Sequence, residues 1–300
     1  MQKYVKIISL ILSIVLSVSI MALIINIILK QNVFNEAYHK NLVNKEGLYK
    51  EIEDRVEEKL KLITTASNFP ETLYQNIVTD DMINVNVDKI LEENIKALNN
   101  QDYDQNVINI DDLLNTYYKR IDDYIASRNV IMNDSAIIVI NDIKLRARVE
   151  VLGAISSINF WTFLENHKDS KYLNLLLRAL QFLDTNTVML SIVILTMIVG
   201  LFALNLKRLM FFFKYAGVAL FIGGAIPFCI GLGGNLSDIS NKILFMGTFA
   251  NKLLCALIDS VFNFLTVSGI ILIIVGVLAI IVSALTSLRR VSRSLRSKTV

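Results

Sequence analysis

The sequence IISLILSIVLSVSIMALIINIIL occupies residues 7–29 and contains no charged side chain. A helix of about 20 apolar residues is long enough to cross the roughly 30 Å hydrocarbon core of a bilayer, so this stretch predicts a transmembrane helix. Lys3 and Lys6 precede it, and no cleavage site of small residues follows it before Lys30. We interpret it as an uncleaved signal anchor, because its apolar run is longer than that of a signal peptide.

Three more apolar stretches follow, at residues 187–206, 215–232 and 262–288. Of the 300 residues in the chain, 54% are hydrophobic and only 19% are charged, and this composition indicates a membrane protein. Only a short segment with Lys207, Arg208 and Lys214 separates the second stretch from the third. We therefore expect these two stretches to form a transmembrane hairpin.

The distribution of basic residues predicts the orientation, because short loops rich in lysine and arginine remain in the cytoplasm. The N-terminus, the hairpin loop and the C-terminal tail carry ten basic residues and no acidic ones. Residues 30–185 carry 18 basic and 25 acidic residues. Both termini are therefore expected in the cytoplasm, and the long region after the first helix is expected outside.

The long outer region is predicted to be a helical bundle, since it contains one proline, Pro70, and two glycines. Apolar residues at helical spacing predict one helix of about 30 residues over 34–63, and a break at Pro70 with a short helix over 71–78 after it. Further helix starts are expected as follows: Thr79, Asp111-Asp112, and Asn133 or Asp134. Short strands at 137–140 and 149–152 are the alternative that this pattern leaves open.

The predicted fold is an all-α membrane protein with four transmembrane helices and a large helical extracytoplasmic domain between the first and the second. The expected segments are the cytoplasmic N-terminus with the first transmembrane helix (1–29), the extracytoplasmic helical bundle (30–186), the transmembrane hairpin (187–232), an extracytoplasmic amphipathic helix (233–261), the fourth transmembrane helix (262–288) and a basic cytoplasmic tail (289–300).

Small residues at regular intervals are candidates for close helix packing. In the first span they recur every four residues, and in the fourth every seven: Ser9, Ser13 and Ser17, then Gly269, Gly276 and Ser283. A seven-residue repeat is the period of left-handed helix packing. Packing within one chain and formation of a homo-oligomer both satisfy this pattern.

The third span is rich in glycine and contains Pro227, which is expected to kink the helix. A broken helix can line a substrate site in transporters. However, the apolar cores of the four spans contain no Asp, Glu, Lys, Arg or His, which disfavours a pump or an ion-coupled transporter. Asn26 and Asn205 lie near span ends, so an interfacial position is expected for both.

Candidates for chemistry are few. His39 and His167 stand far apart and are expected at the solvated surface, and no spacing typical of a catalytic, cofactor or metal site occurs. We therefore expect no enzyme and no cofactor. Cys229 and Cys255 are both expected near the outer face, and the sequence leaves a disulfide between them open.

The C-terminal tail is strongly basic and directly follows the fourth span. Its positive residues are Arg289, Arg290, Arg293, Arg296 and Lys298. Each basic residue near a membrane surface gains about 1 kcal/mol from anionic lipid, so the tail predicts contact with the inner leaflet.

The layout resembles that of uncharacterised four-span membrane proteins of AT-rich Gram-positive bacteria. The residues that carry this resemblance are Phe69-Pro70-Glu71, Thr79-Asp80-Asp81 and the helix start at Asp111-Asp112. The resemblance implies a location in the plasma membrane and carries over no activity and no functional residue.

The leading functional hypothesis is a non-enzymatic membrane protein whose outer helical domain senses a signal or binds a partner. Its expected partners are the lipid bilayer, anionic lipid at the tail, and another membrane or extracytoplasmic protein, with a homo-oligomer as a further possibility and no nucleic acid. A channel or transporter component built around the glycine-rich third span is the alternative. A membrane enzyme is the third hypothesis.

Overall fold

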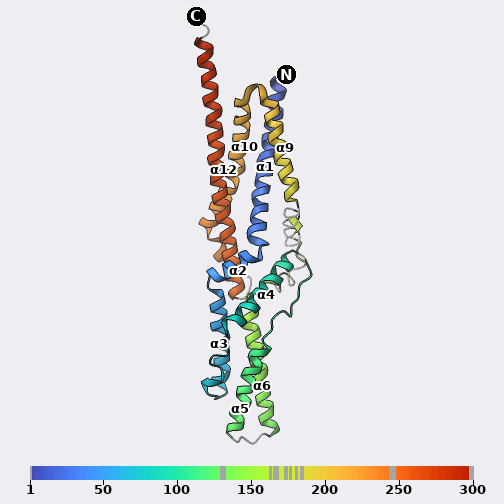
Figure 1. Cartoon of the computed structure of the whole chain (residues 1–300), viewed down its shortest axis with the longest axis vertical. Coiled ribbons are helices and arrows are strands. Elements are labelled where there is room, and N and C mark those ends of the chain that lie inside the picture. Colours follow the sequence, from blue (N-terminus) through green and yellow to red (C-terminus); the bar gives the residue numbers. More distant parts are fainter. Residues whose placement is uncertain are drawn as a thin grey trace. The chain divides into compact units, whose positions relative to one another are not determined.

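The computed structural model describes residues 2–99, 101–128, 133–161, 186–242 and 248–296, together with residues 164, 169–171, 175, 178–179 and 182. All regular elements in this part of the chain are helical, which confirms the predicted all-α class (Figure 1). The chain divides into two compact units. The apolar unit comprises Met1–Val33, Leu175–Lys242 and Leu257–Val300, and the polar unit comprises Phe34–Asn174 and Ile243–Ala256.

The apolar unit is built from long helices of low polarity. Its elements are α1 (Gln2–Ile28), the π-helical turn η1 (Leu29–Val33), α9 (Thr187–Asn205), the 3-10 turn η3 (Leu206–Arg208), α10 (Leu209–Ser237), α11 (Ile239–Lys242) and the larger part of α12 (Thr248–Arg296). In the described residues, three helical stretches are long and apolar enough to cross a membrane: Tyr4–Val33, Thr187–Ser237 and Thr248–Ser287. These stretches indicate a membrane-embedded protein.

Helices α1 and α9 run antiparallel, and hydrogen bonds between side chains join them near both ends. The Asn205 amide donates to Ser9 Oγ at 3.1 Å, and Thr187 Oγ1 donates to Asn26 Oδ1 at 2.9 Å. Both asparagines are buried against the neighbouring helix, near the ends of the two helices. The reason is that an amide in apolar surroundings is stabilised by a hydrogen-bond partner on a facing helix.

Helices α10 and α12 approach so closely that their backbones touch. A Cβ added to Gly224 would lie 2.7 Å from the carbonyl oxygen of Gly269, and a Cβ added to Gly276 would lie 2.8 Å from that of Gly217. Gly231 continues the same face of α10 at the next seven-residue interval and lies against the α12 backbone. Only glycine permits this approach, because any other residue would place a side chain between the helices.

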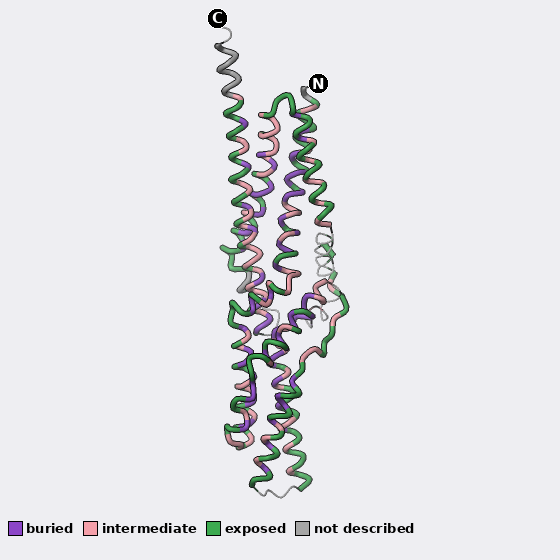
Figure 2. Tube along the Cα trace, in the orientation of Figure 1, coloured by how far each residue is buried: buried purple, intermediate pink, exposed green. Residues whose placement is uncertain are grey.

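The polar unit is a bundle of shorter amphipathic helices. Its elements are α2 (Glu36–Lys45), α3 (Leu48–Ala66), the 3-10 turn η2 (Glu71–Leu73), α4 (Asp80–Leu98), α5 (Asp111–Ser127), α6 (Asp134–Ser156) and the first turns of α12. The buried residues of this unit lie mainly along one side of each helix (Figure 2). Thr79 and Asn133 cap α4 and α6 by accepting hydrogen bonds from the backbone amides of Met82 and Ala136.

Several expectations for the polar unit need correction. The single helix expected over 34–63 is two helices, because Gly47 adopts a left-handed φ of 67° and turns the chain between α2 and α3. The helix expected over 71–78 is only the short turn η2. The strands considered at 137–140 and 149–152 both lie within α6.

The start of α12 belongs to the polar unit. The Ala250 amide donates to the Ser157 carbonyl oxygen at 2.9 Å, and Lys252 forms an ion pair with Glu51 at 2.5 Å. The sequence predicted a separate amphipathic helix up to residue 261 and a fourth span from residue 262. The structure instead has one continuous helix, since no residue between 248 and 296 is a proline or another strong helix breaker that would end it.

Candidate functional site

A polar groove of about 540 Å³ opens on the polar unit between α2, α3 and α4. The buried Ile83 is one of its ten lining residues, and the other nine are polar or charged residues. The lining residues are Lys40, Asn41, Asn44, Tyr49, Lys50, Glu53, Asp80, Ile83, Asn84 and Asp88. We refer to this feature as the polar groove.

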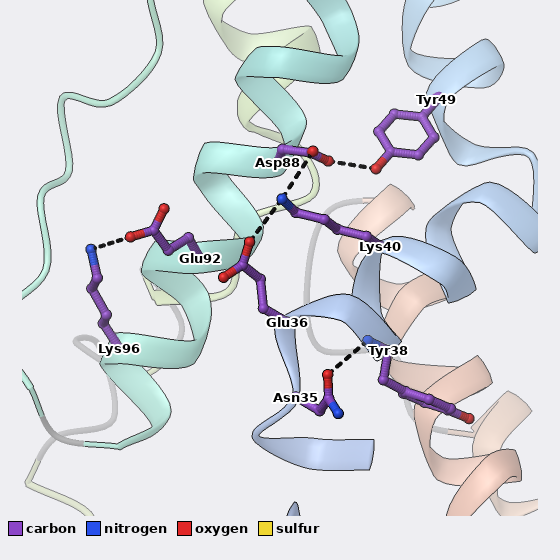
Figure 3. A network of polar contacts seen from close by, with 8 residues as sticks. All are labelled: Asn35, Glu36, Tyr38, Lys40, Tyr49, Asp88, Glu92 and Lys96. Carbon is purple, nitrogen blue, oxygen red and sulfur yellow. Dashed lines mark hydrogen bonds and ion pairs between the residues drawn. The ribbon is translucent and has the colours of Figure 1, made fainter. Parts of the chain in front are cut away.

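Local sequence signals place α2 and α3 at the groove. Asn35 caps α2 by accepting a hydrogen bond from the Tyr38 amide at 3.1 Å. Two residues after α2 ends, Gly47 turns the chain into α3. The turn allows Lys40 from α2 and Tyr49 from α3 to reach the same carboxylate on α4, that of Asp88 (Figure 3).

Asp88 is the centre of a hydrogen-bonded network that fixes the groove wall (Figure 3). Lys40 Nζ lies 2.7 Å from a Glu36 oxygen and 3.0 Å from Asp88 Oδ2. The Tyr49 hydroxyl donates to Asp88 Oδ1 at 2.5 Å. One carboxylate thus joins three helices, so this wall is ordered before any ligand arrives.

The groove carries more negative than positive charge. A hydrogen bond to Glu36 raises the pKa of Lys40, and hydrogen bonds to Glu53 and Asp54 raise the pKa of Lys50. Both lysines are therefore protonated at neutral pH, and each is neutralised by two carboxylates. Asp80 also lines the groove and forms no ion pair with any of the residues that the structure describes. The arrangement favours a ligand group that is positively charged and donates hydrogen bonds.

Replacing Asp88 by asparagine is expected to lower the pKa of Tyr49. Burial raises the pKa of this phenol above its ordinary value of 10.0, and the hydrogen bond to Asp88 raises it further. The variant removes the negative charge of Asp88, which raises the Tyr49 pKa both directly and through the hydrogen bond, and leaves the contribution of burial unchanged. Tyrosinate absorbance, measured against a Tyr49→Phe protein, reports the titration.

The same pKa shift affects stability at high pH. The pKa of Tyr49 is higher in the folded than in the unfolded state. The protonated phenol therefore stabilises the fold fully below pH 10.0, and this stabilisation is lost as the pH rises above that value. Asp88→Asn should reduce this loss, whereas Asp81→Asn, a change on the same helix outside the groove, should not alter it. An identical Tyr49 titration in wild type and Asp88→Asn would contradict the assignment.

No known family matches this chain. Neither family models, nor curated proteins, nor solved structures yield a match. Among the described residues, no group of three or more His, Cys, Asp or Glu side chains could hold a metal ion.

The candidate residues of the first span are buried on α1. Ser9 accepts from Asn205, and Ser13 Oγ donates to the Tyr215 carbonyl oxygen of α10 at 2.8 Å. Ser17 Oγ donates to the Ile14 carbonyl oxygen of its own helix at 2.8 Å. Thus α1 contacts α9 through Ser9 and α10 through Ser13.

The other membrane candidates lie on α10 and α12. Gly269 and Gly276 face the α10 backbone, and Ser283 Oγ donates to the Met210 carbonyl oxygen at 2.6 Å. Pro227 is buried within α10, which continues on both sides of it. In the tail, Arg289, Arg290, Arg293 and Arg296 fall within α12, and Lys298 lies outside the described residues.

The histidine expectation is wrong for His39, which is fully buried in α2. His39 falls on the side of α2 that also carries Leu42 and Val43, and this side packs into the bundle. His167 lies outside the described residues. Cys229 and Cys255 are not joined by a disulfide.

Proposed function

We propose that this chain is a four-span plasma-membrane protein with both termini in the cytoplasm. The support is the division of the apolar stretch Thr187–Ser237 by the turn η3 into two helices. Helix α9 runs antiparallel to α1. Helix α10 runs in the same direction as α1, because Ser13 contacts Tyr215 and, further along both helices, Ile20 lies against Gly223. Lys207 and Arg208 lie in the turn, which suits a cytoplasmic loop.

The proposed role is that of a non-enzymatic membrane protein whose polar unit lies outside the cytoplasm and binds a partner protein, either as a sensor or as an assembly component. The observation that carries this proposal is the polar groove, which has a volume of about 540 Å³ and is lined by three acidic and two basic side chains. Such a groove fits a lysine- or arginine-bearing segment of a partner, because opposite charges across an interface increase association rates and specificity.

Covalent cross-linking in native membranes, followed by recovery of the chain, tests the proposal. Wild type should recover a second protein, and Asp80→Asn should reduce its recovery roughly fivefold, the effect of about 1 kcal/mol. Asp81→Asn is the matched control, because the two residues are neighbours and only Asp80 lines the groove. Equal recovery by both variants, or recovery of this chain alone, would count against partner binding at the groove.

The packing of α10 bears on the alternative role as a channel or transporter component. Gly217, Gly224 and Gly231 face α12 at backbone contact, so this glycine face fills a helix interface. Close helix packing alone explains why glycine occupies these positions, without a role in transport of a solute. Ion flux across the membrane of liposomes that contain the purified protein would support the role as a channel or transporter component.

A further inference from the structure

Basic side chains from two distant parts of the sequence meet at one end of the apolar unit. The Asn205 amide of α9 donates to Ser9 of the antiparallel helix α1. Lys6 lies three residues before Ser9, and Arg208 lies three residues after Asn205, so both continue toward the same end of the helix pair. The N-terminus accordingly lies beside the turn between α9 and α10 (Figure 1). We call Lys6, Lys207 and Arg208 the basic cluster.

The positive charge of the basic cluster is not neutralised within the described part of the apolar unit. All three side chains are exposed, and none forms an ion pair with a described residue. The acidic residues that the structure describes in this unit are Asp238, which directly follows α10, and Asp259 on α12. Asp238 lies about 45 Å from Arg208 along α10, at a rise of about 1.5 Å per residue. Asp259 lies about 35 Å along α12 from Ser283, which contacts the first turn of α10. Salt screens charges over about 8–10 Å, so neither carboxylate reaches the cluster.

An exposed apolar row on α9 ends directly at the basic cluster. Its members recur at four- and three-residue steps and are each between 43% and 72% accessible: Val188, Ile192, Leu195, Val199, Phe202 and Leu206. From Val188 to Leu206 the row is about 27 Å long, which is close to the roughly 30 Å hydrocarbon core of a bilayer. If this row faces the acyl chains, Lys207 and Arg208 lie at the depth of the lipid headgroups.

We propose that the basic cluster binds the phosphate of an anionic phospholipid whose acyl chains lie along the apolar row of α9. The guanidinium of Arg208 can donate two parallel hydrogen bonds to a phosphate, and the two lysines add positive charge. Just below the cluster, Phe202 of α9 packs edge-on against Phe212 of α10, with ring centroids 5.5 Å apart. This contact holds the two helices together where the apolar row meets the cations.

The apolar row favours a lipid over a soluble anion. Inorganic phosphate would use the cations alone, whereas a phospholipid also covers the exposed side chains of α9. The site is separate from the contact expected for the C-terminal tail, because its residues come from α1 and η3. It is also independent of partner binding at the polar groove.

Quenching of tryptophan fluorescence by brominated lipid tests the proposal. The full-length protein carries Trp161→Phe, which removes the single native tryptophan, and Phe202→Trp as a reporter beside the cluster. Symmetric vesicles mix phosphatidylglycerol and phosphatidylcholine, with bromine on the acyl chains of one or the other. Each basic residue near the surface favours anionic lipid roughly fivefold, so phosphatidylglycerol should be preferred roughly tenfold or more at the reporter. Lys207→Gln with Arg208→Gln should lower this preference roughly fivefold or more.

Two controls separate charge at this site from a general effect of anionic lipid. Leu236→Trp places the reporter at an exposed position near the other end of α10, two residues before Asp238, and should show no preference for phosphatidylglycerol. Lys207→Arg with Arg208→Lys keeps both charges and should keep the preference at the Phe202→Trp reporter. Helical circular dichroism of each variant should equal that of wild type, because the exchanged side chains are exposed.

Several outcomes would overturn the proposal. These are equal quenching by the two lipids at the Phe202→Trp reporter, a preference that Lys207→Gln with Arg208→Gln leaves unchanged, and an equal preference at the Leu236→Trp reporter. Loss of the preference in millimolar inorganic phosphate at constant ionic strength would overturn it as well, since the cluster would then take the soluble anion rather than a lipid headgroup.

Discussion

Replacing Gly224 by leucine is expected to destabilise the packing of α10 against α12 by about 3 kcal/mol or more. A Cβ at this position would lie 2.7 Å from both the carbonyl oxygen of Gly269 and the Cβ of Leu272. No side-chain rotamer relieves a clash with backbone, so the two helices must separate. Unfolding of the purified protein by sodium dodecyl sulfate in mixed micelles, followed by circular dichroism, measures the loss.

The control for this experiment is Gly233→Leu on the same helix. A Cβ at Gly233 meets no atom within 4 Å. Both variants gain the same helix propensity, about 0.8 kcal/mol for replacing glycine in a helix, so the difference between them isolates the contact with α12. If both proteins unfold at the same detergent fraction, α10 and α12 do not pack through Gly224.

The seven-residue spacing of Gly269, Gly276 and Ser283 pointed to one face of the last span but not to its partner. The structure places Gly217 and Gly224 of α10 opposite this face, and these two glycines share the seven-residue interval. In the sequence they are surrounded by further glycines, which conceals the interval. A period identifies the face of a helix, whereas the choice of partner depends on how several helices pack together.

Helix starts in the polar unit could be predicted from the sequence where a capping side chain determines them. Thr79 and Asn133 cap helices through their own side chains, as expected. The break at Gly47 was missed because apolar residues continue at helical spacing across it, and a single glycine costs a helix only about 1 kcal/mol. Gly47 adopts the left-handed conformation because α2 and α3 both pack against α4, and this packing requires a turn between them.

The polar groove could not be predicted. Lys40, Tyr49 and Asp88 come from three helices, and each residue is typical of a solvated helix face. Their convergence depends on the turn at Gly47 and on the antiparallel bundle, neither of which leaves a spacing pattern in the sequence. The burial of His39 was missed for the same reason.

Replacing Asn94 by alanine is expected to destabilise the polar unit by about 2–4 kcal/mol. Asn94 is fully buried in α4, where its Oδ1 accepts from the Phe160 amide at 3.0 Å and its Nδ2 donates to the Ile158 carbonyl oxygen at 3.4 Å. The variant leaves two buried backbone groups without this partner, and each such group costs about 1–3 kcal/mol. Chemical denaturation of the full chain measures the loss.

The single tryptophan reports on this region, since Trp161 directly follows Phe160 and is buried. Its fluorescence should shift to the red at lower denaturant concentration in Asn94→Ala than in wild type. Asn84→Ala is the matched control, because Asn84 lies on the same helix but is exposed in the groove. The control should change the free energy of unfolding by less than about 0.5 kcal/mol. An equal shift of the midpoint in both variants would mean that Asn94 does not hold the segment after α6 to α4.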